Sequence, residues 1–478
     1  MYEAVTAAVR DSRLRLCLAA AALVLVTGCA EPRRLNVLMI VSDALRADVI
    51  GSYGGSARTP NIDALALRGV LFENAYSTAP STVPSSVAMF TGRHQHGFPV
   101  VQLLKGTRSY RAHWVSDGQL LFIEALRDAG YDTRKSVENV NAGISNNLQG
   151  FGELQRFGLV PQQQRAWVTQ QLGIRPVLVE RERMFGLLSY LLKQGPDRPF
   201  FALKWILDPH APYDPPAGYR LGFGRALADL PMDPAWYSNR KAGLLATRPE
   251  GLNERERAYI RALYRAEVEF VDERVGYMLE ALRLNSLLDH TLIIFTSDHG
   301  EMFGEHGRWG HPGVLYDEAV RVPLIVAGPG VAAGLRVESV VSLLDLVPTL
   351  AELLGVDAPD DPAGRSLAAA LSGGAIESAA VLLGNKQVHE PRALLDWPHK
   401  LTVSGAEQPP TLFDLSTDRG ELNDLAAEHS NLVGTLGEVL RAMEARNARR
   451  LAIAAEPAGS RPISGATFEK LKALGYLD

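Results

Sequence analysis

Four long apolar runs stand out along the chain, and polar residues close three of them. They are "LNVLMIV" at 35–41, "PFFALKWILDPH" at 199–210, "TLIIFTSDHG" at 291–300 and "RVPLIVAGPG" at 321–330. An uninterrupted apolar run of this length is typical of a strand that is buried on both faces, as in a parallel sheet. We therefore predict four core strands.

Helical spacing of apolar residues separates these runs. Residues at intervals of three and four recur over 253–286, and shorter stretches of the same kind are found at 59–69, 118–129 and 343–355. Strands that alternate with helices predict an α/β fold, with a mainly parallel sheet flanked by helices. Residues 150–190 and 217–252 show no clean period, and we expect surface insertions there.

The pattern changes after about residue 375. Short apolar stretches with polar turns follow, "AAVLLGN", "HKLTVSG" and "TLFDLS", and then a helical stretch at about 430–450. We predict a catalytic domain over 36–375 and a small C-terminal α+β subdomain with a tail over 376–478.

The first 28 residues have a different composition. Three arginines at positions 10, 13 and 15 precede the run "LCLAAAALVLV", and small residues lead to Cys29. The run is shorter than the roughly 20 residues of a spanning helix, and the order is that of a secretory signal. It resembles a bacterial lipoprotein signal, so we expect a signal peptide at 1–28, a lipidated Cys29 and a linker at 29–35. A plain N-terminal anchor is the alternative.

This N-terminal pattern predicts a place in the bacterial cell envelope. The lipid on Cys29 would attach the protein to the membrane on its periplasmic or extracellular face. The formal net charge of -5 excludes a basic nucleic-acid footprint. Cys17 and Cys29 are the two cysteines of the chain, so the mature fold has no disulfide, and oxygen and nitrogen donors must hold any metal.

Acidic residues follow the predicted strands at equivalent places. Asp43 comes after the first run, and Asp298 with His299 comes after the third. Ligands bind at the carboxyl ends of the strands in α/β sheets, and carboxylates with an imidazole suit a divalent ion such as Zn or Mn. We predict a metal site there. An aspartate at a strand end can also simply cap a helix.

A hydroxyl-rich stretch at 77–93, "STAPSTVPSSVAMFTGR", contains a predicted helix at 85–91. Thr82 would lie just before its first turn, where free N–H groups favour an anion. A hydroxyl needs a bound cation, which lowers its pKa, to become a nucleophile. Thr82 is therefore the candidate nucleophile and a further metal ligand. The alternative is that Thr82 or Ser81 is only an N-cap.

Three further residues are candidates for handling the ester. Arg93 could steady the anion, and His210 could protonate the leaving group. His311, in a glycine-rich loop after the proposed metal pair, could contact the charged group. For His210, a turn with a buried histidine is the alternative.

Together these segments resemble the sulfatase family of the alkaline phosphatase superfamily. The matching motifs are "NVLMIVSDALRADVIGSYG" at 36–54, "PSSVAMFTGRHQHG" at 84–97, "DPHAPYDPP" at 208–216, "TSDHGEMFGEHGRWGH" at 296–311, "LYDEAVRVPLIV" at 315–326, "LLDLVPTLAELLGV" at 343–356 and "LFDLSTDRGELNDLA" at 412–426. The resemblance implies the family's α/β fold and a metal-dependent activity on esters.

The chain departs from the sulfate-ester pattern at the nucleophile. The family's Cys (or Ser)-x-Pro-Ser-Arg reads "TVPSS" at 82–86. Thr cannot form the family's formylglycine aldehyde, because its β-carbon carries a methyl, so no formylglycine is expected. The usual Asp-Asp pair is "DA" at 43–44, Asp-Asn is "DH" at 298–299, and a lysine near the sulfate is replaced by His311.

This set resembles superfamily members with an unmodified Thr, such as phosphoethanolamine transferases and nucleotide phosphodiesterases. It implies one or two divalent ions, with Zn or Mn favoured and Ca or Mg as alternatives.

The sequence thus predicts a metal-dependent hydrolase of a sulfate or phosphate ester that uses Thr82 and a covalent intermediate. Its substrate would be a small anionic ester or a sulfated or phosphorylated glycan. The alternatives are a transferase that passes a phospho-group to a surface glycan or lipid, and a non-catalytic relic that binds a glycan.

Overall fold

The computed structural model describes the part of the chain that follows the N-terminal segment, with several gaps. The described residues are 34–98, 100–105, 108–113, 115, 121–143, 147–154, 160–175, 184–195, 198–220, 253–311, 313–358, 361–384, 391–405, 408–454 and 460–462. The predicted signal peptide at 1–28 and Cys29 lie outside these residues. Residues 36–478 form one compact unit, so the domain boundary predicted at 375/376 falls within it.

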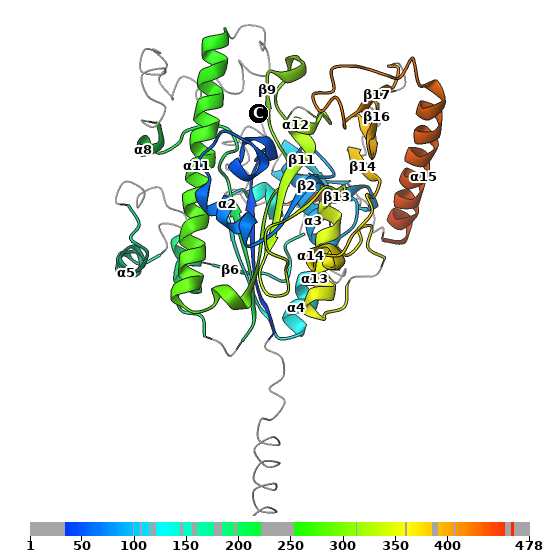
Figure 1. Cartoon of the computed structure of the whole chain (residues 1–478). Helices are drawn as coiled ribbons and strands as arrows, with labels where there is room; N and C mark the ends of the chain where they lie inside the picture. The colour runs from blue at the N-terminus through cyan, green and yellow to red at the C-terminus, as the bar shows by residue number, and fades with distance from the viewer. Residues whose placement is uncertain are drawn as a thin grey trace, which may run out of the picture. The chain divides into compact units, whose positions relative to one another are not determined.

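A central sheet of nine strands, counted over the described residues, organises the fold (Figure 1). Eight strands follow the order β12-β2-β11-β8-β1-β7-β5-β6, and β13 pairs with β2. Their bounds are β1 (Asn36–Ser42), β2 (Gly69–Tyr76), β5 (Asp132–Val137), β6 (Gly152–Glu153), β7 (Phe200–Ile206), β8 (Thr291–Ser297), β11 (Arg321–Ala327), β12 (Leu335–Val337) and β13 (Val341–Ser342).

Strand β1 lies between two parallel neighbours, β7 and β8, and the register aligns their carboxyl ends. Ser42, the last residue of β1, lies opposite Ile206 of β7 and Ser297 of β8. Asp43 and Asp298 each follow directly. The segment after β7 that carries Asp208 and His210 begins at the same edge, as the apolar runs predicted.

Both faces of the sheet are covered, which explains the uninterrupted apolar strands. In β1, Leu38 and Ile40 pack with α2 (Pro60–Leu67), α7 (Phe185–Leu191) and α11 (Glu254–Leu284). Val37, Met39 and Val41 point the other way, toward α3 (Thr82–Thr91), α4 (Phe122–Asp128), α13 (Leu346–Leu354) and α14 (Ala368–Leu371). Figure 1 shows α11 along one side of the sheet and α3 and α13 on the other.

The C-terminal region builds a four-stranded antiparallel sheet. It comprises β14 (Val381–Gly384), β15 (Arg392–Asp396), β16 (His399–Val403) and β17 (Thr411–Asp414), and α15 (Ser430–Ala454) packs against it through Leu436 and Leu440. Its other face shares a buried cluster with Tyr76, Leu315 and Val320 of the main sheet region. The α+β subdomain is therefore present as predicted.

The remaining elements are short or peripheral. They are β3 (Val100–Lys105), β4 (Arg108–His113) and β18 (Ser460–Pro462) in one small sheet, the hairpin β9 (Met302–Phe303) and β10 (Trp309–Gly310), and helices α5 (Gln162–Leu172), α8 (Ala217–Arg220) and α12 (Asp317–Val320). Among the described residues, none of the helices combines the length and the apolarity that a membrane crossing requires.

The mainly parallel α/β fold is confirmed, with two differences from the prediction. Strand β11 runs antiparallel to β8 and to β2. Within 150–190, where surface insertions were expected, α7 is a core helix: Phe185, Leu187 and Leu188 are fully buried. An apolar run as short as "FGLLSYL" shows too few turns to display a helical period.

Candidate active site

The turn that follows β1 is held tightly and carries Asp43. Ala44 adopts a left-handed conformation (φ 57°), which is uncommon for a residue with a Cβ and concentrates at functional sites. In this conformation its backbone N–H donates to Asp298 Oδ1 at 3.1 Å, and its carbonyl accepts from the Tyr264 hydroxyl at 2.7 Å. The strained turn thus ties Asp43 to the end of β8.

The end of β8 presents Asp298 and His299, both fully buried. Asp298 Oδ1 also accepts the His299 N–H at 3.0 Å. The ring of His299 donates from Nδ1 to the Gly300 carbonyl at 2.8 Å, because a carbonyl oxygen can only accept. This bond fixes the tautomer and leaves the lone pair on Nε2, the form in which histidine binds a metal.

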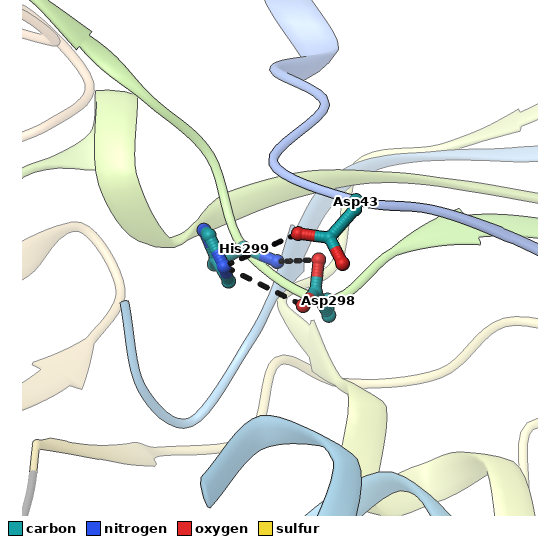
Figure 2. Close-up of side chains that lie close together, drawn as sticks. All are labelled: Asp43, Asp298 and His299. Carbon is teal, nitrogen blue, oxygen red and sulfur yellow. Dashed lines mark hydrogen bonds and ion pairs between the residues drawn. The ribbon is translucent and has the colours of Figure 1, made fainter. Parts of the chain in front are cut away.

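These three side chains converge, as Figure 2 shows. His299 Nε2 lies 3.4 Å from Asp298 Oδ2 and 3.8 Å from Asp43 Oδ1, and the three residues form a cluster that could hold a metal ion. Ligand atoms around a tetrahedral ion with bonds of about 2.0–2.1 Å stand roughly 3.3 Å apart. The spacing of the cluster therefore fits a single divalent ion.

The electrostatics of the cluster also fit a divalent cation. Asp43 Oδ1 and Asp298 Oδ2 are buried and accept no hydrogen bond from the described residues. Burial raises the pKa of Asp43 to about 7, with the Asp298 charge adding to it, and burial raises the pKa of Asp298 to about 6. It lowers the pKa of His299 to about 4. Two unpaired carboxylates and a neutral imidazole fit a divalent cation, which would supply the absent charge.

Thr82 opens helix α3 beside this cluster. It is the first helical residue, with Ser81 as N-cap and Pro84 still within the first turn, where proline is tolerated because that N–H has no intrahelical partner. Thr82 is fully buried, and its Oγ1 lies 3.4 Å from His299 Nε2. The candidate nucleophile and the three candidate ligands are thus brought together.

Two residues that the sequence analysis missed hold this group in place. Asp43 Oδ2 accepts from Asn139 Nδ2 at 2.7 Å and from Trp205 Nε1 at 2.8 Å. Asn139 Nδ2 also lies 3.4 Å from Thr82 Oγ1. Asn139 follows β5, and the polar sequence "DTRKSV" of this strand does not show the apolar pattern of a core strand. Trp205 lies within the apolar run of β7, where nothing in the sequence distinguishes it from its apolar neighbours. Asn139 could have been predicted only if β5 had been recognised as a parallel strand beside β7, because Asn139 follows the end of that strand.

His311 returns to the cluster from the glycine-rich loop. Its ring centroid lies 4.5 Å from that of His299, and its Nδ1 is 3.0 Å from Glu301 Oε1. Burial alone would lower the pKa of His311, but the Glu301, Asp43 and Asp298 carboxylates together outweigh it, and the pKa lies above its usual value. These carboxylates thus favour the cationic form of His311 beside His299. Glu301, the last residue of the "DHGE" motif, is a third residue whose role the sequence did not predict.

His210 is part of the same group. Its ring centroid is 5.1 Å from that of His311 and 6.4 Å from that of His299. The ring donates from Nδ1 to the Ala211 carbonyl at 2.7 Å, which leaves Nε2 as the atom that can carry a proton to a ligand.

Arg93 lies at the other end of the helix that Thr82 opens. It follows the C-cap Gly92, and about 15 Å of helix axis separates the two ends of this ten-residue helix. That Arg93 steadies the anion stays a prediction. His306, in the same glycine-rich loop as His311, stacks on Tyr316 with ring centroids 3.6 Å apart.

Comparison with known proteins identifies the family of the chain. The Sulfatase family model matches residues 35–356, and the model of the N-sulphoglucosamine sulphohydrolase C-terminal region matches residues 304–446. Arylsulfatase K of Bos taurus is 27% identical over 467 residues, covering 87% of this chain and 82% of the relative. An arylsulfatase of Clostridium perfringens is 25% identical over 381 residues, covering 70% and 77%.

Solved structures also resemble the chain in fold. The phosphonate monoester hydrolase of Agrobacterium radiobacter superposes with a TM-score of 0.66 at 25% identity, covering 87% of this chain and 96% of that one. A structure in complex with its substrate D-glucosamine-2-N,6-O-disulfate superposes with a TM-score of 0.66 at 20% identity, covering 87% and 98%. With its fold, its strand-end acids and these matches, the chain belongs to the sulfatase family of ester hydrolases.

Proposed function

We propose that this protein is a metal-dependent hydrolase of sulfate or phosphate esters in which Thr82 is the nucleophile. One observation carries the proposal: Thr82 Oγ1 lies 3.4 Å from the metal-binding nitrogen of His299, beside two buried carboxylates with unpartnered oxygens. An N-cap role alone would not explain this position, because the Ser81 N-cap and the Thr82 side chain are separate residues and no side-chain cap bond forms.

Asp43, Asp298, His299 and Thr82 would hold the ion. A divalent cation at this place lowers the pKa of a hydroxyl and neutralises charge on ester oxygens. Zn or Mn suits the two carboxylates and the imidazole, and Ca or Mg are the alternatives. No formylglycine takes part, because the nucleophile position is a threonine.

Three residues of the chain would have separate roles in the reaction. The deprotonated Thr82 oxygen attacks sulfur or phosphorus, and the bond from that centre to the alcohol oxygen breaks. His210 donates a proton to the departing oxygen, and the cationic His311 contacts the anionic oxygens. Water then cleaves the ester formed on Thr82 and restores the hydroxyl.

A sulfated or phosphorylated glycan, or another small anionic ester, is the substrate that this site would accept. The solved relatives include structures with D-glucosamine-2-N,6-O-disulfate and with a carrageenan hexaose, and a 2-O glycosaminoglycan sulfatase. These relatives are 20–21% identical, so their ligands suggest which compounds to try first.

The N-terminal sequence supports a location for this activity. The segment at 1–28 with Cys29 after Gly28 is typical of a lipoprotein signal. We propose that a lipid on Cys29 anchors the enzyme in a bacterial cell envelope. Mass spectrometry of the protein purified from membranes should find acylated Cys29 as the first residue, and an intact residue 1 would exclude it.

The experiment that tests the catalytic proposal uses purified protein supplied with Zn or Mn. Aryl sulfate, aryl phosphate, a phosphodiester and a phosphonate monoester with the same chromophoric alcohol are compared. We expect turnover of at least one of them, and Thr82→Ala should lower kcat by roughly 10⁴-fold or more, as loss of a nucleophile does.

Ser81→Ala is the matched control. It removes the neighbouring hydroxyl at the N-cap, which makes no side-chain cap bond, so its activity should stay near that of the wild type. Equal activity of Thr82→Ala and the wild type would exclude Thr82 as the nucleophile. A wild-type protein that turns over none of the four esters would exclude the hydrolase.

A further inference from the structure

A second group of charged side chains lies directly behind the candidate active site. Arg274 of α11 is 2% exposed in its side chain and reaches into the carboxyl edge of the sheet. One of its guanidinium nitrogens donates to Asp208 Oδ2 at 2.7 Å, and another donates to Glu138 Oε1. A single side chain thus connects the ends of β5 and β7 to the long helix.

Glu138 connects the same two strand ends from the other direction. Its Oε2 accepts the backbone N–H of Leu207 at 3.1 Å, and its Oε1 also accepts from Lys204 Nζ at 2.7 Å. Lys204 is fully buried in β7. Each of the four charges in this network, on Arg274, Lys204, Glu138 and Asp208, therefore has an opposite charge in contact.

Both acidic members of the network are close neighbours in sequence of active-site residues. Glu138 directly precedes Asn139, which contacts Asp43 and Thr82. Asp208 lies two residues before His210, and the His210 N–H donates to the Leu207 carbonyl at 2.9 Å. The Asp208 carbonyl accepts from Ser42 Oγ at 2.7 Å, so backbone and hydroxyl contacts hold the turn. Arg274 holds the Asp208 side chain.

We propose that Arg274 is a positioning residue that holds the turn at 207–210, and with it His210, in line with the group that His210 protonates. The inference rests on the proposed function, in which His210 is the proton donor. The planar guanidinium of Arg274 presents its N–H donors in fixed directions, so this one side chain can hold two carboxylates that lie on different strand ends.

The physical basis is the sensitivity of proton transfer to geometry. A catalytic group that moves by about 1 Å can lose roughly 100-fold in rate. The backbone bonds of the turn restrain its own shape, but the Arg274 contact restrains the turn relative to α11 and to the Asn139 segment. Without it, the turn should stay folded while His210 samples a wider range of positions.

The test uses a double variant that keeps the buried charges balanced. Arg274→Met with Asp208→Asn removes one cation and one anion and leaves the Lys204–Glu138 pair intact. Arg58→Met with Glu269→Gln is the matched control, because this pair also joins α11 to another segment, at 2.9 Å, but touches no active-site residue. Circular dichroism and thermal melting establish that both variants fold.

The deciding readout is the dependence on the leaving group. A 4-nitrophenyl ester departs with little help from an acid, whereas a phenyl ester of the same anion needs a proton. We expect the double variant to lose roughly 100-fold in kcat on the phenyl ester and to change little on the 4-nitrophenyl ester, with the control unchanged on both. An equal loss on both esters, or no loss on either, would overturn the proposal.

A second readout does not depend on activity. Hydrogen exchange followed by mass spectrometry should show faster exchange of the 207–210 amides in the double variant, with β8 unchanged. Unchanged exchange of the 207–210 amides would overturn the positioning role. If the wild type hydrolyses no ester, the proposed function fails separately, and the exchange result alone decides whether Arg274 fixes this turn.

Discussion

This protein has two groups of buried charged residues, which are linked because Glu138 of one group precedes Asn139, a contact of Asp43 in the other. The groups differ in whether their carboxylates have partners. In the first, Glu138 contacts the cations Lys204 and Arg274, and both of its oxygens accept hydrogen bonds. In the second, Asp43 and Asp298 each leave one buried oxygen without a partner among the described residues. In the first group, each carboxylate contacts a cation of the protein; in the second, neither aspartate contacts a lysine or an arginine among the described residues.

The pKa values follow this difference. The cations beside Glu138 outweigh its burial and hold the pKa of its carboxyl well below the usual range, whereas burial raises the pKa of Asp43 to about 7. A buried charge costs several kcal/mol unless it is paired, so a fold that keeps unpaired carboxylates must gain from them elsewhere. The comparison teaches that paired buried acids hold a structure together, whereas unpaired ones identify a candidate cation site.

Among the changes that test this comparison, removing one carboxylate of the unpaired group should have the largest effect. Asp298→Asn keeps the acceptor for the Ala44 and His299 amides but loses a charged metal ligand. We expect kcat to fall by roughly 10³-fold or more, at the upper end of what one charge-stabilising group contributes. Ester hydrolysis by the metal-supplied variant is the measurement, and full activity would show that Asp298 does not serve the ion.

The same change in the paired group should affect stability instead. Glu138→Gln leaves two buried cations with one remaining partner, Asp208, and should lower the free energy of unfolding by about 3–5 kcal/mol. Metal-free Asp298→Asn should be at least as stable as the metal-free wild type, because it removes one of two repelling charges. Urea unfolding after chelation measures both, and equal destabilisation by the two changes would remove the distinction between the groups.

A smaller effect should follow from loosening the support of Asp43. Trp205→Phe keeps the buried ring but removes the Nε1 donor that lies 2.8 Å from Asp43 Oδ2. Loss of such a supporting bond typically costs 10–100-fold in metal affinity. Competition with a chelator of known affinity gives the value, and Phe90→Leu, which alters a ring packed on Trp205, serves as a control that should leave the affinity near that of the wild type.

The smallest effect concerns pH and the paired group. The pKa of Glu138 is lowered by folding, so its contribution to stability is complete above the unfolded value of about 4.3 and is lost as the pH falls through the folded value. The free energy of unfolding of the wild type should therefore fall more steeply below pH 4.3 than that of Glu138→Gln. Parallel curves for the two proteins would show that folding does not lower the pKa of Glu138.

Much of the fold could be predicted because its core strands are buried on both faces. The apolar runs at 35–41 and 291–300 gave β1 and β8, and the acids that follow them identified Asp43 and Asp298. Strand β5 could not be recognised, because its residues "DTRKSV" show neither an apolar run nor a clean alternation, and Asn139 was missed with it. Its place in the sheet depends on pairing with β7, which is a tertiary property.

Distance along the chain explains the remaining differences at the site. Thr82 and Arg93 are close in sequence, but a helix lies between them and separates them in space. His311 and Glu301 show the opposite case, because a hairpin brings residues ten positions apart into contact at 3.0 Å. Local motifs therefore predicted several residues that gather at the candidate site, and the contacts that orient those residues required the fold.

Metal content tests the central claim most directly. The protein is purified, stripped with a chelator, reloaded with Zn or Mn, and its bound metal is measured by inductively coupled plasma mass spectrometry beside Asp298→Asn and Ser81→Ala. The account predicts at least one tightly bound ion per chain in the wild type and in Ser81→Ala, and its loss in Asp298→Asn. A folded wild-type protein that retains no divalent ion, or an Asp298→Asn variant that retains it fully, would contradict the account.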